Sequence, residues 1–127
     1  MPRTEIEHDP VRPSDFVAED GIVSLGALIA RLHVTKGDLS AATGLPRDSL
    51  TKRARLAAPR TQQRLRDVVE ILARVAPWAG SMPQAYAWYR AQPLPSFGGL
   101  TAEDLVKEGR AEAVKRHLSR IAEGGYA

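Results

Sequence analysis

Apolar residues recur at intervals of three and four along most of this chain, which is the spacing of one face of an α-helix. The first such run follows a polar, proline-containing segment, residues 1–20. Its apolar members are Ile22, Leu25, Leu28, Ile29 and Leu32. Ser24 or Asp20 can serve as the N-cap of this helix. The pattern therefore predicts a flexible acidic arm over residues 1–20 and a helix directly after it.

A capping box marks the start of a second, short helix. Thr35 and Asp38 stand three residues apart, so each side chain can accept a hydrogen bond from the backbone N–H of the other. Gly44 can adopt the left-handed conformation and end this helix. Pro46 suits the first turn of the next helix, where its missing N–H costs nothing. We expect that third helix to run from about Pro46 to Leu56.

The helix expected over residues 61–76 has a wide apolar face. Its apolar members are Leu65, Val68, Val69, Ile71, Leu72, Val75 and Ala76. They cover about half of the helix circumference, which is more than the single stripe of a surface helix. This width favours a helix buried on one side in its own domain and on the other in a second subunit, although deep burial within one chain explains it equally. We expect Pro77 to end the helix.

Three shorter helical patterns fill the rest of the chain. The first carries Trp88 to one side of a face made of Met82, Ala85, Tyr86 and Tyr89. The second starts at a capping box, Thr101 with Asp104, and ends at Gly109. The last has its core face on Ala113, Val114, Leu118, Ile121 and Ala122. Gly124 is its expected C-cap, and the whole chain is predicted to be all-α.

Positive charge is concentrated in the middle of the chain. The net charge is +3, but residues 24–66 carry nine Lys or Arg against two acids. Residues 1–23 carry two arginines against six acids, and residues 67–127 carry seven charges of each sign. A basic segment of this kind is typical of a unit that binds nucleic acid.

Composition excludes several other classes. The absence of cysteine excludes disulfides, thiol nucleophiles and cysteine-ligated zinc. His8, His33 and His117 lie far apart without ligand-like neighbours, and phosphate-loop and nucleophile-elbow motifs are absent. We therefore expect no enzyme, no metal and no cofactor. The acidic, polar N-terminus and the lack of a long apolar run predict a cytoplasmic protein without a membrane partner.

The string D-L-S-A-A-T-G-L-P-R-D-S-L-T-K-R resembles the helix-turn-helix of phage-repressor-like, Xre-type DNA-binding proteins. The matching positions are the apolar Leu39, Leu45 and Leu50, the small Ser40 where the helices cross, and Gly44 in the turn. One position departs from the motif, because its last apolar site falls near Arg53, so Ala54 is expected to serve instead. Two ordinary packed helices are the alternative interpretation.

A recognition helix in this position would present a polar stripe to DNA. With Leu50 turned inward, that stripe consists of Arg47, Asp48, Thr51, Lys52 and Arg55. Arg47 or Lys52 is suited to reading guanine edges in the major groove. Phosphate contacts are expected from Arg53, Arg55, Arg60, Arg64 and Arg66.

The C-terminal half resembles the toxin-binding domain of Xre/MbcA/ParS-type antitoxins. The matching features are Trp88, the loop 93–99, Thr101-x-x-Asp104-Leu105-Val106, Gly109, Val114, Leu118, Ile121 and the Gly-Gly-Tyr-Ala end. The resemblance implies a Xre-like helix-turn-helix bundle over residues 21–60, a small helical toxin-binding domain over residues 61–127, and repression of the protein's own operon.

This resemblance also implies the partners. Such antitoxins pair with a RES-domain toxin that consumes NAD, so we expect a toxin–antitoxin hetero-oligomer, operator DNA and a homodimer. The segment Gly124, Gly125, Tyr126 and Ala127 is expected to enter or block the toxin's NAD pocket, with Trp88 as a further toxin contact. The glycines permit close approach, and tyrosine is an anchor residue common at hot spots. The alternative is a stand-alone helix-turn-helix repressor without a toxin.

Overall fold

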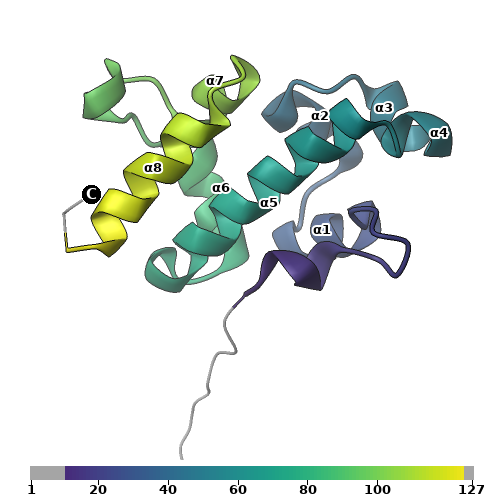
Figure 1. Ribbon diagram of the computed structural model, residues 1–127, viewed down its shortest axis with the longest axis horizontal. Helices are drawn as coiled ribbons and strands as arrows, with labels where there is room; N and C mark the ends of the chain where they lie inside the picture. The colour runs from purple at the N-terminus through teal and green to yellow at the C-terminus, as the bar shows by residue number, and fades with distance from the viewer. Residues whose placement is uncertain (1–10, 125–127) are drawn as a thin grey trace, which may run out of the picture.

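The computed structural model describes residues 11–124, and every element in that range is a helix (Figure 1). The elements are η2 (Pro13–Phe16), α1 (Leu25–Leu32), α2 (Lys36–Thr43), α3 (Arg47–Thr51), α4 (Arg53–Leu56), α5 (Pro59–Ala79), α6 (Met82–Ala91), η3 (Pro95–Phe97), α7 (Ala102–Lys107) and α8 (Ala111–Ala122). In the described residues, extended pairing is confined to one isolated bridge between Val17 and Val23. The all-α prediction is confirmed.

Helix α5 is the centre of the molecule, with α1 to α4 gathered around one half of it and α6 to α8 around the other (Figure 1). The seven apolar residues on the wide face of α5 are each at most 5% exposed in the single chain. The face is therefore covered by the chain's own helices. Deep burial explains its width, and the argument from this face for a second subunit is wrong.

Pro77 does not end α5, contrary to expectation. The helix continues to Ala79, and Gly80 ends it with a φ of 114°. A proline so near the C-terminus removes a single i→i−4 hydrogen bond, and its ring faces solvent. Gly80 supplies the left-handed residue that completes the helix end. The three residues beyond Ala76 bring Trp78 into the helix.

The segment 11–20 packs against the helices through Phe16. This corrects the prediction of a flexible arm for residues 11–20. Phe16, in η2, is 1% exposed, and η2 lies against α5 and α1. The Ser24 N–H donates a 2.7 Å hydrogen bond to the Phe16 carbonyl. The aromatic side chain of Phe16 therefore fixes this segment by burial. Residues 1–10 lie outside the described residues.

The expected local signals set most helix ends. The side-chain hydroxyl of Ser24, rather than the carboxylate of Asp20, caps α1. Both predicted capping boxes form, Thr35 with Asp38 on α2 and Thr101 with Asp104 on α7. Gly44 ends α2 with a φ of 75°.

The third predicted helix is broken in two, which corrects the expectation of one helix from Pro46 to Leu56. Lys52 has φ −86° and ψ 122° and separates α3 from α4. The Thr51 hydroxyl donates a 2.9 Å hydrogen bond back to the Arg47 carbonyl, a contact that weakens a helix locally. Leu50 and Leu56 are six positions apart, so one continuous helix would point them to different sides.

The break lets both leucines face the core. Leu50 is 2% exposed, and Leu56 is half-buried against the core cluster. Ala54 is exposed, so it does not take the apolar position expected of it. The buried side chain of Gln62 on α5 links the end of α4 to the segment before α1. It accepts a hydrogen bond from the Val23 N–H and donates one to the Leu56 carbonyl.

One continuous core joins the two halves of the chain. Its buried members run from Phe16 through α1, α2, α3 and α5 to Leu118 on α8. On α8, Val114 and Leu118 are buried as predicted, Ala113 and Ile121 are half-buried, and Ala122 is exposed. The domain limits at residues 60 and 61 remain a prediction.

Candidate functional site

An apolar groove lies where the ends of α5, α6 and α8 meet the loop between α6 and α7. Its volume is about 460 Å³. Its lining includes Trp78, Trp88, Pro93, Leu94, His117 and Ile121. We call it the tryptophan groove, because both of the chain's tryptophans line it.

The two tryptophans pack edge to face, with ring centroids 5.7 Å apart and planes at 88°. This is a favoured geometry for aromatic pairs. Trp78 is 48% exposed, a large value for an aromatic side chain in the described residues. Trp88 was predicted as a contact residue, whereas Trp78 was missed because Pro77 was expected to end α5. Gly80 was the signal that could have kept Trp78 in the helix.

The opposite wall of the groove is a tight loop. The Leu94 N–H donates to the Leu100 carbonyl at 2.9 Å, and this contact closes the loop around η3. Phe97 packs edge to face on His117, with centroids 5.8 Å apart. Burial, together with the charge of Arg120, lowers the pKa of His117, so the imidazole in this wall favours its neutral form.

The last described residue, Gly124, lies two positions past the end of α8 at Ala122. The C-cap of α8 is Glu123, which corrects the expectation that Gly124 would be the C-cap. The Gly124 N–H donates to the Ile121 carbonyl at 3.2 Å, and the φ of Gly124 is 112°. The residues that line the tryptophan groove include the predicted contact Trp88 but not Gly124. Gly125, Tyr126 and Ala127, the other predicted toxin contacts, lie outside the described residues.

The six residues predicted to contact DNA are all exposed, on α3, on α4 and at the joint between them. They are Arg47, Asp48, Thr51, Lys52, Arg53 and Arg55. Two of the arginines form ion pairs with carboxylates. Arg53 Nη2 lies 2.9 Å from Asp20 Oδ2, and Arg55 Nη1 lies 3.1 Å from Asp48 Oδ2. Because the helix breaks at Lys52, the expected single stripe is split between two short helices.

Arg64 does not belong to this exposed set, which corrects one predicted phosphate contact. Its Nη1 donates a 2.6 Å hydrogen bond to the carbonyl of Thr43, at the end of α2. The guanidinium is thus used to hold two helices together. Arg60 and Arg66 remain exposed.

Three side chains bind three consecutive carbonyls at the end of α2. Lys107 donates to Ala41 at 3.0 Å, Tyr89 donates to Ala42 at 2.7 Å, and Arg64 donates to Thr43. The last carbonyls of a helix lack partners within it and carry its negative dipole end, so two cations and a hydroxyl suit them. We call these three hydrogen bonds the carbonyl clamp. They join α2 to α5, α6 and α7.

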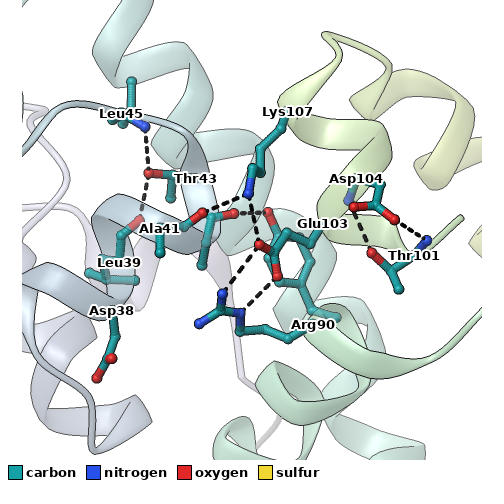
Figure 2. Close-up of polar contacts among 12 residues, drawn as sticks. Asp38, Leu39, Ala41, Thr43, Leu45, Arg90, Thr101, Glu103, Asp104 and Lys107 are labelled. Atoms are coloured by element: carbon teal, nitrogen blue, oxygen red, sulfur yellow. Dashed lines mark hydrogen bonds and ion pairs between the residues drawn. The ribbon is translucent and has the colours of Figure 1, made fainter.

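A buried carboxylate supports the clamp. Glu103 on α7 accepts hydrogen bonds from Arg90 at 2.7 and 3.3 Å and from Lys107 at 3.0 Å, as Figure 2 shows. The hydrogen bond to Glu103 raises the pKa of Arg90, although burial opposes this. Burial also raises the pKa of Tyr89, so its hydroxyl stays a donor. The carbonyl clamp therefore connects α2, which precedes the candidate DNA-contact helices, to α5 and α6, which also carry Trp78 and Trp88.

Two further features bear on function. Between residues 11 and 124, no set of three or more histidine, aspartate or glutamate side chains is arranged to hold a metal ion. Within the same range, no helix has both the length and the apolar character needed to cross a membrane.

The family comparison places the groove inside a known domain. Residues 75–124 match the family described as antitoxin Xre/MbcA/ParS C-terminal toxin-binding domain. The match begins on the last turn of α5 and ends at Gly124, so it includes Trp78, Trp88, His117 and Ile121. No curated protein and no solved structure matches the chain. The family predicted for the C-terminal half is confirmed.

Proposed function

We propose that this chain, an antitoxin of the Xre/MbcA/ParS type, neutralises a NAD-consuming RES-domain toxin by blocking the toxin's active site with its C-terminal segment. The observation that carries this proposal is the tryptophan groove, all of whose lining residues lie within the stretch 75–124 that matches the toxin-binding domain. An antitoxin of this kind acts by binding, so its role is regulatory and not enzymatic.

The groove provides the anchor for the toxin. Tryptophan is enriched among the residues that dominate binding energy, and such residues lie in apolar pockets surrounded by polar groups. Trp78 and Trp88 form such a pair on an exposed surface of the chain. In the proposal, the toxin packs against them, and the segment Gly124 to Ala127 enters the toxin's NAD pocket. The two glycines let the backbone pass close to the toxin.

Truncation after Glu123 tests the proposal. The neighbouring gene product is produced with the full chain or with residues 1–123, and the purified mixtures are assayed for NAD consumption. We expect the full chain to suppress NAD consumption and the truncated chain to lose suppression. Trp88→Ala should weaken toxin capture. A truncated chain that still inhibits fully would exclude the C-terminal segment as the blocking element.

The same protein is proposed to bind the operator of its own operon through α2 to α4. In this reading α2 and α3 form the helix-turn-helix, and the carbonyl clamp fixes α2 and so aims α3 at the DNA. Arg47 and Lys52 read bases, with Asp48 and Thr51 beside them, and Arg53 and Arg55 bind phosphates.

Arg47→Ala separates base reading from general affinity. We expect it to weaken operator binding by about 1–3 kcal/mol and binding to random DNA much less. Equal losses on both would leave Arg47 as a phosphate contact. A homodimer, which two operator half-sites require, has to form through a surface other than the wide face of α5.

A further inference from the structure

The nine described residues that line the tryptophan groove include no carboxylate, and arginines border the groove on α8. We propose that the groove takes an apolar side chain flanked by carboxylates, so that the toxin segment seated on Trp78 and Trp88 is acidic. The identity of the partner rests on the proposed function, whereas the charge preference of the groove is a property of the free chain.

Most of the groove is built from a part of the sequence without negative charge. No aspartate or glutamate occurs from residue 71 to residue 102, a stretch that holds the end of α5, all of α6 and the loop to α7. Glu70 and Glu103, which border the stretch, are each bound by two cations of the chain at 2.7 to 3.2 Å. These walls therefore present no free carboxylate that would repel an acidic ligand.

Two exposed arginines stand on the remaining wall, α8. Arg116 and Arg120 are one helical turn apart, and within residues 11–124 neither forms an ion pair. Like charges at this spacing repel each other. Glu112, one turn before Arg116, is bound by Lys115 at 3.1 Å instead. Even with Glu123 counted, the exposed end of α8 keeps a net positive charge that the described part of the chain does not use.

This positive charge reaches the groove. Arg120 follows the lining residue His117 by three positions, and its charge adds to burial in lowering the pKa of His117. A second cation stands near the same wall, because Arg110 Cζ lies 5.7 Å from the centroid of the Phe97 ring that packs on His117. Glu108 contacts Arg110 at 3.5 Å, but both side chains are about half exposed, so this pair is weak. An apolar surface in a positive field favours a ligand that carries carboxylates.

The shape of the surface favours a protein segment over a nucleic acid. Trp78 also lines an adjoining hollow of about 340 Å³ between α5 and α8, so the apolar surface extends beyond the size of one side chain. The two indoles meet edge to face, and the prolines and Leu94 of the loop complete a concave apolar wall. Nucleic-acid bases need flat rings on which to stack, whereas an aliphatic or aromatic side chain fits such a concave surface.

Blocked tripeptides test the charge preference on the free chain. The two indole N–H signals in a nitrogen–proton correlation spectrum report on the groove, because both tryptophans of the chain line it. We expect Glu-Leu-Glu to shift both signals and to bind about fivefold more tightly than Lys-Leu-Lys, since opposite charges attract across the rim. Glu-Ala-Glu should bind as weakly as Lys-Leu-Lys, because it lacks the apolar side chain.

Matched variants assign the preference to the two arginines. The double variant Arg116→Gln, Arg120→Gln should bind the acidic and the basic peptide equally. Lys36→Gln removes an exposed cation from α2, among the helices around the other half of α5, and should keep the difference.

Binding rates to the purified neighbouring gene product test the same preference in the complex. We expect the double arginine variant to slow association about tenfold at low salt and to change dissociation little, because rim charges act mainly on the encounter of the partners. Trp88→Ala should instead mainly speed dissociation, as contact losses within an interface usually do.

The outcomes separate this inference from the proposed function. Equal affinity for Glu-Leu-Glu and Lys-Leu-Lys would overturn the charge preference, and an oligothymidine that shifts the indole signals as strongly as Glu-Leu-Glu would overturn the assignment to a protein segment. Capture of the gene product at a rate that neither salt nor the arginine variant changes would refute an acidic toxin segment and leave the proposed function standing. A chain that selects the acidic peptide but does not capture the gene product would support the preference and refute the proposed function.

Discussion

The hydroxyl of Tyr89 donates a 2.7 Å hydrogen bond to the carbonyl of Ala42, forty-seven positions earlier in the chain. Tyr89 is fully buried on α6, and Ala42 is in the last turn of α2. This contact therefore ties the toxin-binding domain to the helix that precedes the candidate recognition helix. It is the central bond of the carbonyl clamp.

Tyr89→Phe should destabilise the protein measurably. The change removes the donor and leaves the buried Ala42 carbonyl without its partner, so we expect a loss of about 1–2 kcal/mol in the free energy of unfolding. Urea denaturation measures this value. Tyr86→Phe is the matched control, because its hydroxyl is 3.4 Å from the Asp38 carbonyl and the side chain is half-buried. Equal losses in the two variants would contradict a special role for Tyr89.

Glu103→Ala should destabilise the framework more than loss of a surface acid. Arg90 and Lys107 share the carboxylate of Glu103, whose side chain is 10% exposed. The substitution leaves both cations without this partner. We expect a cost of about 1–3 kcal/mol, below that of a fully buried pair because both cations keep contact with water. The free energy of unfolding from urea titration is the measurement.

Asp48→Ala provides the comparison for Glu103. Asp48 and Arg55 form an ion pair whose side chains are 64% and 60% exposed. Its loss should cost at most about 0.5 kcal/mol, as for surface pairs in general. A similar cost in both variants would mean that the buried position of Glu103 adds nothing.

Asp20→Asn should strengthen DNA binding, on the proposed function. Asp20 holds Arg53 at 2.9 Å, so the acid competes with a phosphate for the guanidinium. We expect higher affinity for operator and random DNA alike, measured by fluorescence anisotropy over a range of salt concentrations. Arg53→Ala should do the opposite and lower the salt slope by about one.

Asp15→Asn controls for the change in net charge. It removes one acid from the same segment, but Asp15 accepts its hydrogen bond from the Arg12 N–H. If Asp15→Asn raises DNA affinity as much as Asp20→Asn, general charge explains the effect and the pairing with Arg53 does not.

Acid should weaken the protein in part through Asp104. The hydrogen bonds from the Thr101 backbone N–H and hydroxyl lower the pKa of Asp104 below its ordinary value of 3.8. The folded state therefore holds this proton less tightly than the unfolded state does. The contribution of Asp104 to stability is complete above pH 3.8 and is lost as the pH falls through the lowered pKa.

Asp104→Asn should remove this part of the acid dependence. Thermal denaturation between neutral pH and pH 2 should then give a flatter curve for the variant than for the parent, with the difference confined to the acid end. Thr101→Val should flatten the curve in the same sense. An unchanged acid slope in both variants would show that the capping box contributes no pH dependence.

Several local features were predictable because they depend on residues close in sequence. Thr35 with Asp38 and Thr101 with Asp104 form their capping boxes within three residues, and Gly44 turns the chain by its own backbone freedom. The apolar spacing on α5 identified its buried face correctly, although the pattern could not say what covered it. The family of the C-terminal half was also predictable from its motifs.

The sequence by itself determined the helical composition, most helix starts and the residues able to form a core, because these follow from backbone preferences and from contacts within a helical turn. The tertiary structure decided where α3 breaks, that Phe16 is buried, and that the Arg64 side chain binds a carbonyl of its own chain. It also paired Trp78 with Trp88 and brought Tyr89 and Lys107 to the end of α2. Those outcomes depend on burial and on partners up to 66 positions away, which no local pattern specifies.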